Sequence, residues 1–125
     1  MNTVKFSSGG GPVVASVSIS PQRDGSYELR LWEREANGFV APSPWHGNFT
    51  NLDDDAYSLP RPNSDNDGRL LQCLAVAVVP AGAKPAALSL TVSQDGTELG
   101  RETRTVLPGT SDQFLSLWLM LKKGA

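Results

Sequence analysis

The sequence predicts an all-β protein, built as a single antiparallel β-sandwich of about 7–8 strands. Segments in which apolar and polar residues alternate recur every 8 to 12 residues or so, and a period of two is typical of a strand with one buried face. Turn-forming pairs such as Asp24-Gly25 and Asp95-Gly96 stand between these segments. A small closed β-barrel is the alternative architecture.

The first strands are predicted between residues 13 and 31. Val13, Ala15, Val17 and Ile19 share one face, while Val14 and three serines lie on the other, and a turn at 21–25 follows. The next segment, 27–31, alternates in the same way, which completes a hairpin. A third strand is expected to begin at 39–41, where prolines at 42 and 44 interrupt it and make it an edge strand or a broken strand.

The second half of the chain predicts a central strand and a second hairpin. Segment 69–79 is apolar at both odd and even positions, as in a strand that is buried on both faces. Segments 87–94 and 97–107 flank Asp95-Gly96 and form the hairpin. The last segment, 112–123, fits either a strand or a helix, and the strand is favoured because every earlier element is β.

Length and composition set limits on function. The chain has 125 residues and a net charge of −2, so we expect one domain (1–125) and no nucleic-acid partner. One cysteine and one histidine provide neither a disulfide nor a zinc site. No apolar run is long enough to span a membrane and no signal peptide is visible, so we expect a cytoplasmic, bacterial-type protein, with export without a visible signal left open.

The acidic residues are concentrated in a long loop predicted at 51–68. Residues 53–67 contain five aspartates and one arginine, a net charge of −4. Clustered Asp and Asn oxygens suit calcium, so the candidate metal ligands are Asp53, Asp55, Asp65 and Asp67. Segment 63–68 matches the start of an EF-hand loop, but Leu74 stands where the bidentate glutamate is required. No cofactor is required, and the simpler interpretation is that these residues form turns.

Segment 45–49 lies next to this loop and contains aromatic and polar residues. The candidate ligand-binding residues are Trp45, His46, Asn48 and Tyr57. Aromatic rings stack on sugar rings while amides and carboxylates bind hydroxyl groups, so a carbohydrate is one candidate ligand. The alternative is that these rings fill the core.

Two further segments are candidates for association. Period two places Trp32 on the same face as Glu28 and Arg30, away from the core. In segment 114–121 four leucines share one face, and Phe114, Trp118 and Met120 lie on the other. An apolar strand of this kind needs covering, and a homodimer would provide the cover.

The sequence therefore predicts a non-catalytic binding or interaction module whose ligand surface is formed by loop 51–68 and segment 45–49, with a protein or a carbohydrate as ligand. The alternative is a structural or assembly protein, either a homo-oligomer or an accessory subunit of a bacterial complex, that uses Trp32 and segment 114–121. A small hydrolase that uses His46 and an aspartate is a third hypothesis. It is disfavoured because no Gly-x-Ser-x-Gly motif is present.

Overall fold

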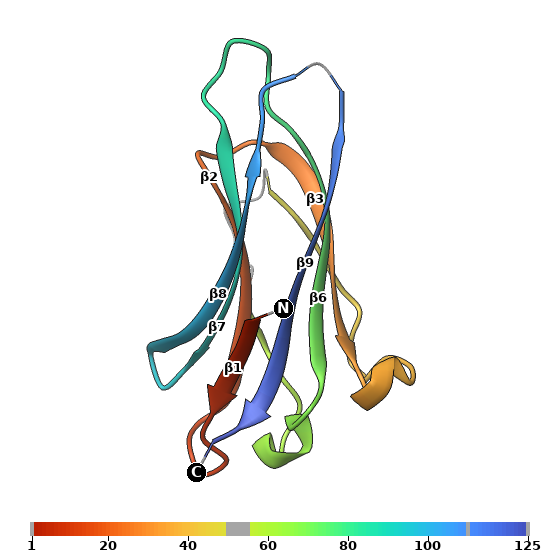
Figure 1. Ribbon diagram of the computed structural model, residues 1–125, viewed down its shortest axis with the longest axis vertical. Helices are drawn as coiled ribbons and strands as arrows, with labels where there is room; N and C mark the ends of the chain where they lie inside the picture. Colours follow the sequence, from red (N-terminus) through yellow and green to blue (C-terminus); the bar gives the residue numbers. More distant parts are fainter. Residues whose placement is uncertain (1, 50–55, 110, 125) are drawn as a thin grey trace.

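Two β-sheets pack face to face and enclose one core (Figure 1). The computed structural model describes residues 2–49, 56–109 and 111–124. The first sheet contains, in spatial order, β1 (Asn2–Phe6), β9 (Gln113–Lys123), β6 (Leu70–Val78), β3 (Asp24–Trp32) and β4 (Trp45–Asn48). The second contains β5 (Ala56–Ser58), β2 (Val13–Ser20), β7 (Ala86–Gln94) and β8 (Thr97–Val106). The predicted β-sandwich is confirmed.

Several details of the architecture differ from the prediction. The hairpin predicted between residues 13 and 31 is wrong, because β2 and β3 belong to different sheets and residues 21–23 cross from one sheet to the other. The described residues form nine strands rather than seven or eight, and the two sheets do not close into a barrel. β1 pairs with β9 in parallel, whereas the other strand pairs in the described ranges are antiparallel. The helical alternative for 112–123 is wrong, because β9 pairs along its length with β6.

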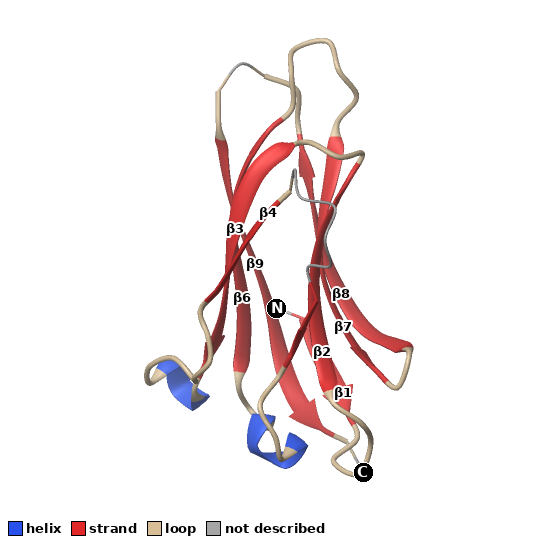
Figure 2. Ribbon diagram, turned by 180° about the vertical axis from the view of Figure 1, so that it is seen from behind, coloured by secondary structure: helices blue, strands red, loops and turns tan. Residues whose placement is uncertain are grey.

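The long loop contains more structure than its composition suggests. Segment 51–68 includes the short strand β5 and the 3-10 helix η2 (Asn63–Asn66), which lies at the same end of the sandwich as the 3-10 helix η1 (Arg34–Ala36) (Figure 2). The strand expected at 39–41 is reduced to a single bridge between Trp32 and Phe39. Prolines at 42 and 44 lack the N–H groups that a longer pairing needs.

The core contains the inward-facing residues of both sheets, as the alternation requires. Leu29, Cys73 and Leu117 lie side by side on the neighbouring strands β3, β6 and β9, and all three are fully buried. β6 lies between β3 and β9, as expected of the central strand. Among the described residues, no helix is long and apolar enough to cross a membrane.

The four edge strands are short or charged. β1, β4 and β5 contain at most five residues each. β8 is longer, and it carries two ion pairs, Arg101 with Glu98 at 2.7 Å and Arg104 with Glu102 at 2.5 Å. Short strands and charged side chains both discourage the addition of a further strand at an edge. The faces of the sheets are therefore the better candidates for an interaction surface.

Candidate functional site

The outer face of the five-stranded sheet is largely apolar along β6 and β9 and at Trp32 of β3, whereas Glu28 and Arg30 make the middle of β3 charged. Trp32 and Phe114 are more than 80 positions apart in the sequence, yet β6 brings β3 and β9 onto either side of itself, so both project from the same face. Phe114 is 82% exposed. We call this surface the apolar face, and it consists of Trp32, Leu70, Leu74, Val76, Phe114, Trp118 and Met120.

The outer face of the four-stranded sheet has the opposite character. Its central strands β2 and β7 present mainly hydroxyl side chains there, and Ser89 is bonded to Thr103 across β7 and β8 at 3.1 Å. We call this surface the hydroxyl face, and it consists of Ser16, Ser18, Ser20, Ser89, Thr91, Ser93, Thr103 and Thr105. The same chain thus presents a polar surface on one sheet and a largely apolar one on the other.

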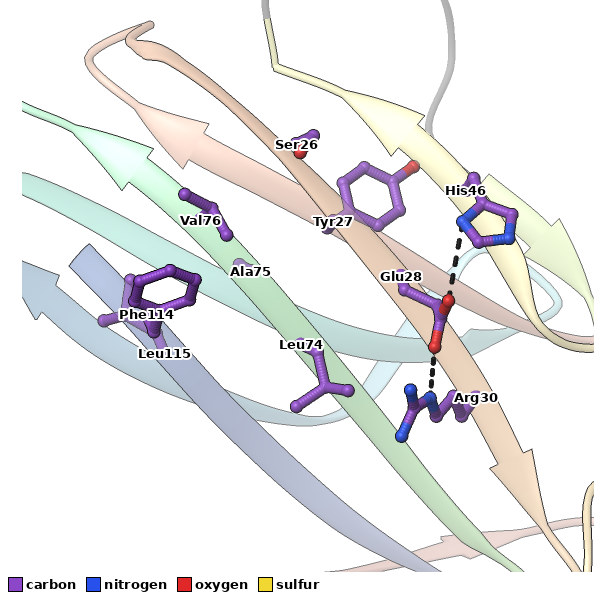
Figure 3. Close-up of a pocket in the computed structure, with 10 residues that line it drawn as sticks. All are labelled: Ser26, Tyr27, Glu28, Arg30, His46, Leu74, Ala75, Val76, Phe114 and Leu115. Atoms are coloured by element: carbon purple, nitrogen blue, oxygen red, sulfur yellow. Dashed lines mark hydrogen bonds and ion pairs between the residues drawn. The ribbon is translucent and has the colours of Figure 1, made fainter. Parts of the chain in front are cut away.

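A groove of about 370 Å³ crosses the apolar face (Figure 3). One wall comes from β6 and β9 and includes Leu74, Val76 and Phe114. The opposite wall comes from β3 and β4 and is charged: the Glu28 carboxylate accepts a hydrogen bond from Arg30 and lies 3.7 Å from Nδ1 of His46. The groove therefore combines an apolar wall with a charged wall, which suits an amphipathic partner surface.

Trp32 lies at one end of the apolar face, where it contacts Gln72 and Phe39. Its indole Nε1 donates to Oε1 of Gln72 at 2.8 Å, and its ring lies 4.4 Å from the ring of Phe39. The Arg30 guanidinium lies 5.3 Å from the same Phe39 ring, within the range of a cation–π interaction. These contacts fix the indole, so that it forms a rigid part of the apolar face.

The four predicted ligand-binding residues do not form one surface. Trp45 and Tyr57 stack on each other, with ring centroids 5.4 Å apart and planes inclined by 26°. Both pack against the core, at the edge where β4 of one sheet meets β5 of the other. His46 and Asn48 alternate with Trp45 along β4 and face outward, and His46 lines the groove. Because side chains alternate along β4, residues that are adjacent in the sequence lie on opposite faces of the strand.

Tyr27 and Gly47 were not among the sequence candidates, although they organise this edge. Tyr27 donates or accepts a hydrogen bond with the Tyr57 hydroxyl at 2.5 Å, and its ring lies 5.4 Å from that of Phe49. A Cβ atom at position 47 would lie 2.1 Å from the Tyr27 ring, so only glycine fits there. A glycine within a strand often marks a place where another group approaches the backbone closely, and Gly47 could have been identified in this way.

The predicted metal ligands are only partly described. Asp53 and Asp55 lie outside the described residues. Asp65 is exposed, and the Asp67 carboxylate accepts a hydrogen bond from the Lys123 backbone N–H at 2.8 Å. This hydrogen bond lowers the pKa of Asp67, and the charges of nearby lysines and Arg34 act in the same direction.

Asn63, the first residue of the EF-hand-like segment, has a structural role. Its side chain is buried, and Nδ2 donates to the carbonyl oxygens of Gly10 at 3.1 Å and Gly11 at 2.9 Å. The Gln94 amide also donates to Gly11, at 2.9 Å. Within the described ranges, no group of three or more His, Cys, Asp or Glu side chains is placed to hold a metal ion. The calcium site remains a prediction.

Comparisons with known protein families, with curated proteins and with solved structures give no match to this chain. The functional argument therefore rests on the geometry of the two sheet faces and of the groove.

Proposed function

We propose that this protein is a non-catalytic interaction module that binds another protein chain through the apolar face. One observation carries the proposal, namely the contrast between the apolar face and the hydroxyl face of the same sandwich. A large apolar patch on a sheet surface is typical of an interaction site. The proposal selects the association surface that the sequence assigns to Trp32 and segment 114–121, in a protein that we expect to be cytoplasmic.

The composition of the surface supports a protein partner over a sugar. Aromatic residues and methionine are enriched where proteins meet, and Trp118 and Met120 are partly exposed here beside Phe114. The groove wall that contains Leu74 and Val76 has no side-chain hydrogen-bonding groups for sugar hydroxyls, and in the opposite wall the Glu28 carboxylate is already bonded to Arg30. The rings of Trp45 and Tyr57, which were candidates for sugar stacking, contact each other.

The polar side chains around His46 form one wall of the groove. His46 lies 3.7 Å from Glu28, and the same carboxylate already accepts a hydrogen bond from Arg30. These three residues form a charged wall for a partner to contact.

A photo-cross-linking amino acid in place of Ser116 tests the proposal. Ser116 is exposed on the outer face of β9, opposite Leu74, and exposed Ser18 on the hydroxyl face provides the matched control. In extracts of the source cells, we expect protein adducts from position 116 and far fewer from position 18. Phe114→Glu in the same chain should abolish the adducts at 116, whereas Ser18→Glu should preserve them. Equal yields at both positions would refute the proposal.

A further inference from the structure

The apolar face carries opposite charges at the two ends of β9. Asp112 directly precedes the strand and Lys122 lies near its end, and both side chains are exposed. Neither forms an ion pair with any other residue in the described ranges. Lys5 of β1 lies beside Lys122 in the parallel register, so two positive charges are adjacent there, and the Asp67 carboxylate, which is within electrostatic range of Lys122, is already bonded to the Lys123 backbone N–H. Like charges in adjacent positions are unfavourable unless a partner neutralises them.

The outward residues of β9, together with Asp112 just before the strand, have a character that is complementary to the same residues taken in the opposite direction. Counted from Leu117, they form three pairs at equal distances: Ser116 with Trp118, Phe114 with Met120, and Asp112 with Lys122. The outer pair has opposite charges and the middle pair is apolar. A second copy of the strand in the opposite direction would therefore place complementary side chains against each other.

The neighbouring strands share this centre. Leu117 is opposite Cys73 on β6, and Cys73 is opposite Leu29 on β3, so one line across the sheet passes through all three. On β3, Glu28 and Arg30 stand on either side of that line with opposite charges. A two-fold axis along this line would place Glu28 of one copy opposite Arg30 of the other. The same axis therefore brings opposite charges together on both β3 and β9.

We propose that the occupant of the apolar face is a second copy of this chain, packed face to face about a two-fold axis that crosses the strands at the level of Leu117. This inference rests on the proposed function and names its partner. In the dimer, Asp112 of each copy faces Lys122 of the other, and Phe114 of each copy covers Met120 of the other. Face-to-face sheets of this kind pack about 10 Å apart.

The available area suits a dimer. At about 3.3 Å per residue and about 4.8 Å between strands, the five-stranded sheet presents roughly 600 Å² of projected area. Side chains make the accessible area larger, and a standard interface buries about 800 Å² on each partner. The charged and short edges of both sheets leave the face as the surface that a second copy can use.

Sedimentation equilibrium of the full chain, with charge exchange between the two ends of β9, tests the dimer. The wild type should have twice the chain mass of 13.3 kDa. The symmetric dimer contains the contact between positions 112 and 122 twice. Asp112→Lys makes both contacts positive with positive, and Lys122→Asp makes both negative with negative, so each variant should raise the dimer dissociation constant about tenfold or more at low salt. An equimolar mixture of the two variants should form a heterodimer, because both contacts are then opposite in charge. Thr105→Lys, on the hydroxyl face, should leave the dissociation constant unchanged.

The possible outcomes separate the dimer from the proposed function. A wild type that stays at 13.3 kDa up to high concentration overturns the dimer. Single variants that associate as well as the wild type, or a mixture that associates no better than either variant alone, overturn this arrangement. Adducts from position 116 to a different protein, lost with Phe114→Glu, would then preserve the proposed function. Circular dichroism establishes that each variant is folded.

Discussion

The indole ring of Trp45 stacks on the phenol ring of Tyr57, with centroids 5.4 Å apart. Trp45 belongs to β4 of one sheet and Tyr57 to β5 of the other, so this ring contact joins the two sheets at an edge where, among the described residues, no strand pairing connects them. The Tyr57 hydroxyl also bonds to that of Tyr27 at 2.5 Å. The side chains of Trp45, Tyr57 and Tyr27 thus connect the two sheets on one side of the sandwich.

A double-mutant cycle measures this contact. Aromatic pairs stabilise a protein by about 0.5–1.5 kcal/mol beyond the area that they bury. We expect Trp45→Ala and Tyr57→Ala to show a coupling energy of that size in urea unfolding. Phe114→Ala and Tyr57→Ala form the control pair, because Phe114 lies on the outer face and should be additive with Tyr57. A coupling energy near zero for Trp45 and Tyr57 would contradict the stacking.

The Cys73 thiol should be unreactive in the folded protein. Burial raises the pKa of this thiol to about 12, from an ordinary value of 9.0. Because the thiolate is the reactive form, a thiol-specific reagent at pH 8 should label the native protein only as fast as it unfolds. Ser18→Cys, at an exposed position, should add one rapidly labelled thiol. Rapid labelling of the wild type would show that Cys73 is accessible.

Asn63 should help to hold the segment at residues 7–11. Its Nδ2 group donates to the carbonyl oxygens of Gly10 and Gly11, and the Gln94 amide also donates to that of Gly11. Asn63→Ala should lower the free energy of unfolding by about 1–3 kcal/mol, because these half-buried carbonyl groups lose a donor. Ser64→Ala, at an exposed position in the same 3-10 helix, should have little effect. Equal stabilities for the two variants would argue against this role.

Asp67 should contribute a stability that depends on pH. Its native pKa is lowered by the hydrogen bond from the Lys123 backbone N–H, so folding favours the charged carboxylate. The contribution is complete above the ordinary pKa of 3.8 and is lost as the pH falls through the lowered native value. Asp67→Ala should therefore destabilise the protein at pH 7 and make less difference at pH 2. Urea unfolding at both pH values measures this, and Asp65→Ala provides the control.

Thermal unfolding with millimolar calcium, and with magnesium as a control, tests the predicted metal site. A ligand that binds only the folded state at a hundredfold excess over its dissociation constant adds about 2.7 kcal/mol to stability. A site at the acidic loop predicts a calcium-specific rise in the melting temperature that Asp53→Asn and Asp55→Asn together abolish. An unchanged melting temperature would assign these aspartates to turn formation alone.

Much of the fold could be predicted because its long strands repeat a simple pattern. The alternation in β2 and β3 identified both strands, and the two apolar faces of β6 identified the central strand. The predicted hairpin was wrong, because a turn that is local in sequence does not determine whether the chain stays in one sheet or crosses to the other. β1 and β5 were missed because strands of five and three residues are too short to show a period. The parallel pairing of β1 depends on a partner at the other end of the sequence.

The candidate site was harder to predict, since it depends on which strands are neighbours. Alternation indicated that Trp32 and Trp118 each face away from the core, but only the position of β6 between β3 and β9 unites them on one surface. Trp45 and His46 are adjacent in sequence and face opposite sides of β4. Asn63 matched the first position of an EF-hand-like segment. Its contacts in the structure are to residues 10 and 11, more than 50 positions away, and contacts at that distance leave no local pattern in the sequence.

The parallel pairing of β1 with β9 also determines when this protein can finish folding during synthesis. Asn2 is opposite Leu119 and Phe6 is opposite Lys123, so β1 is made more than 100 residues before β9 and has no sheet partner until β9 has left the ribosome. Contacts between such distant residues form slowly, because a long loop must close first. We expect β2 to β8 to assemble while the nascent chain grows, and β1 to join only after β9 has emerged.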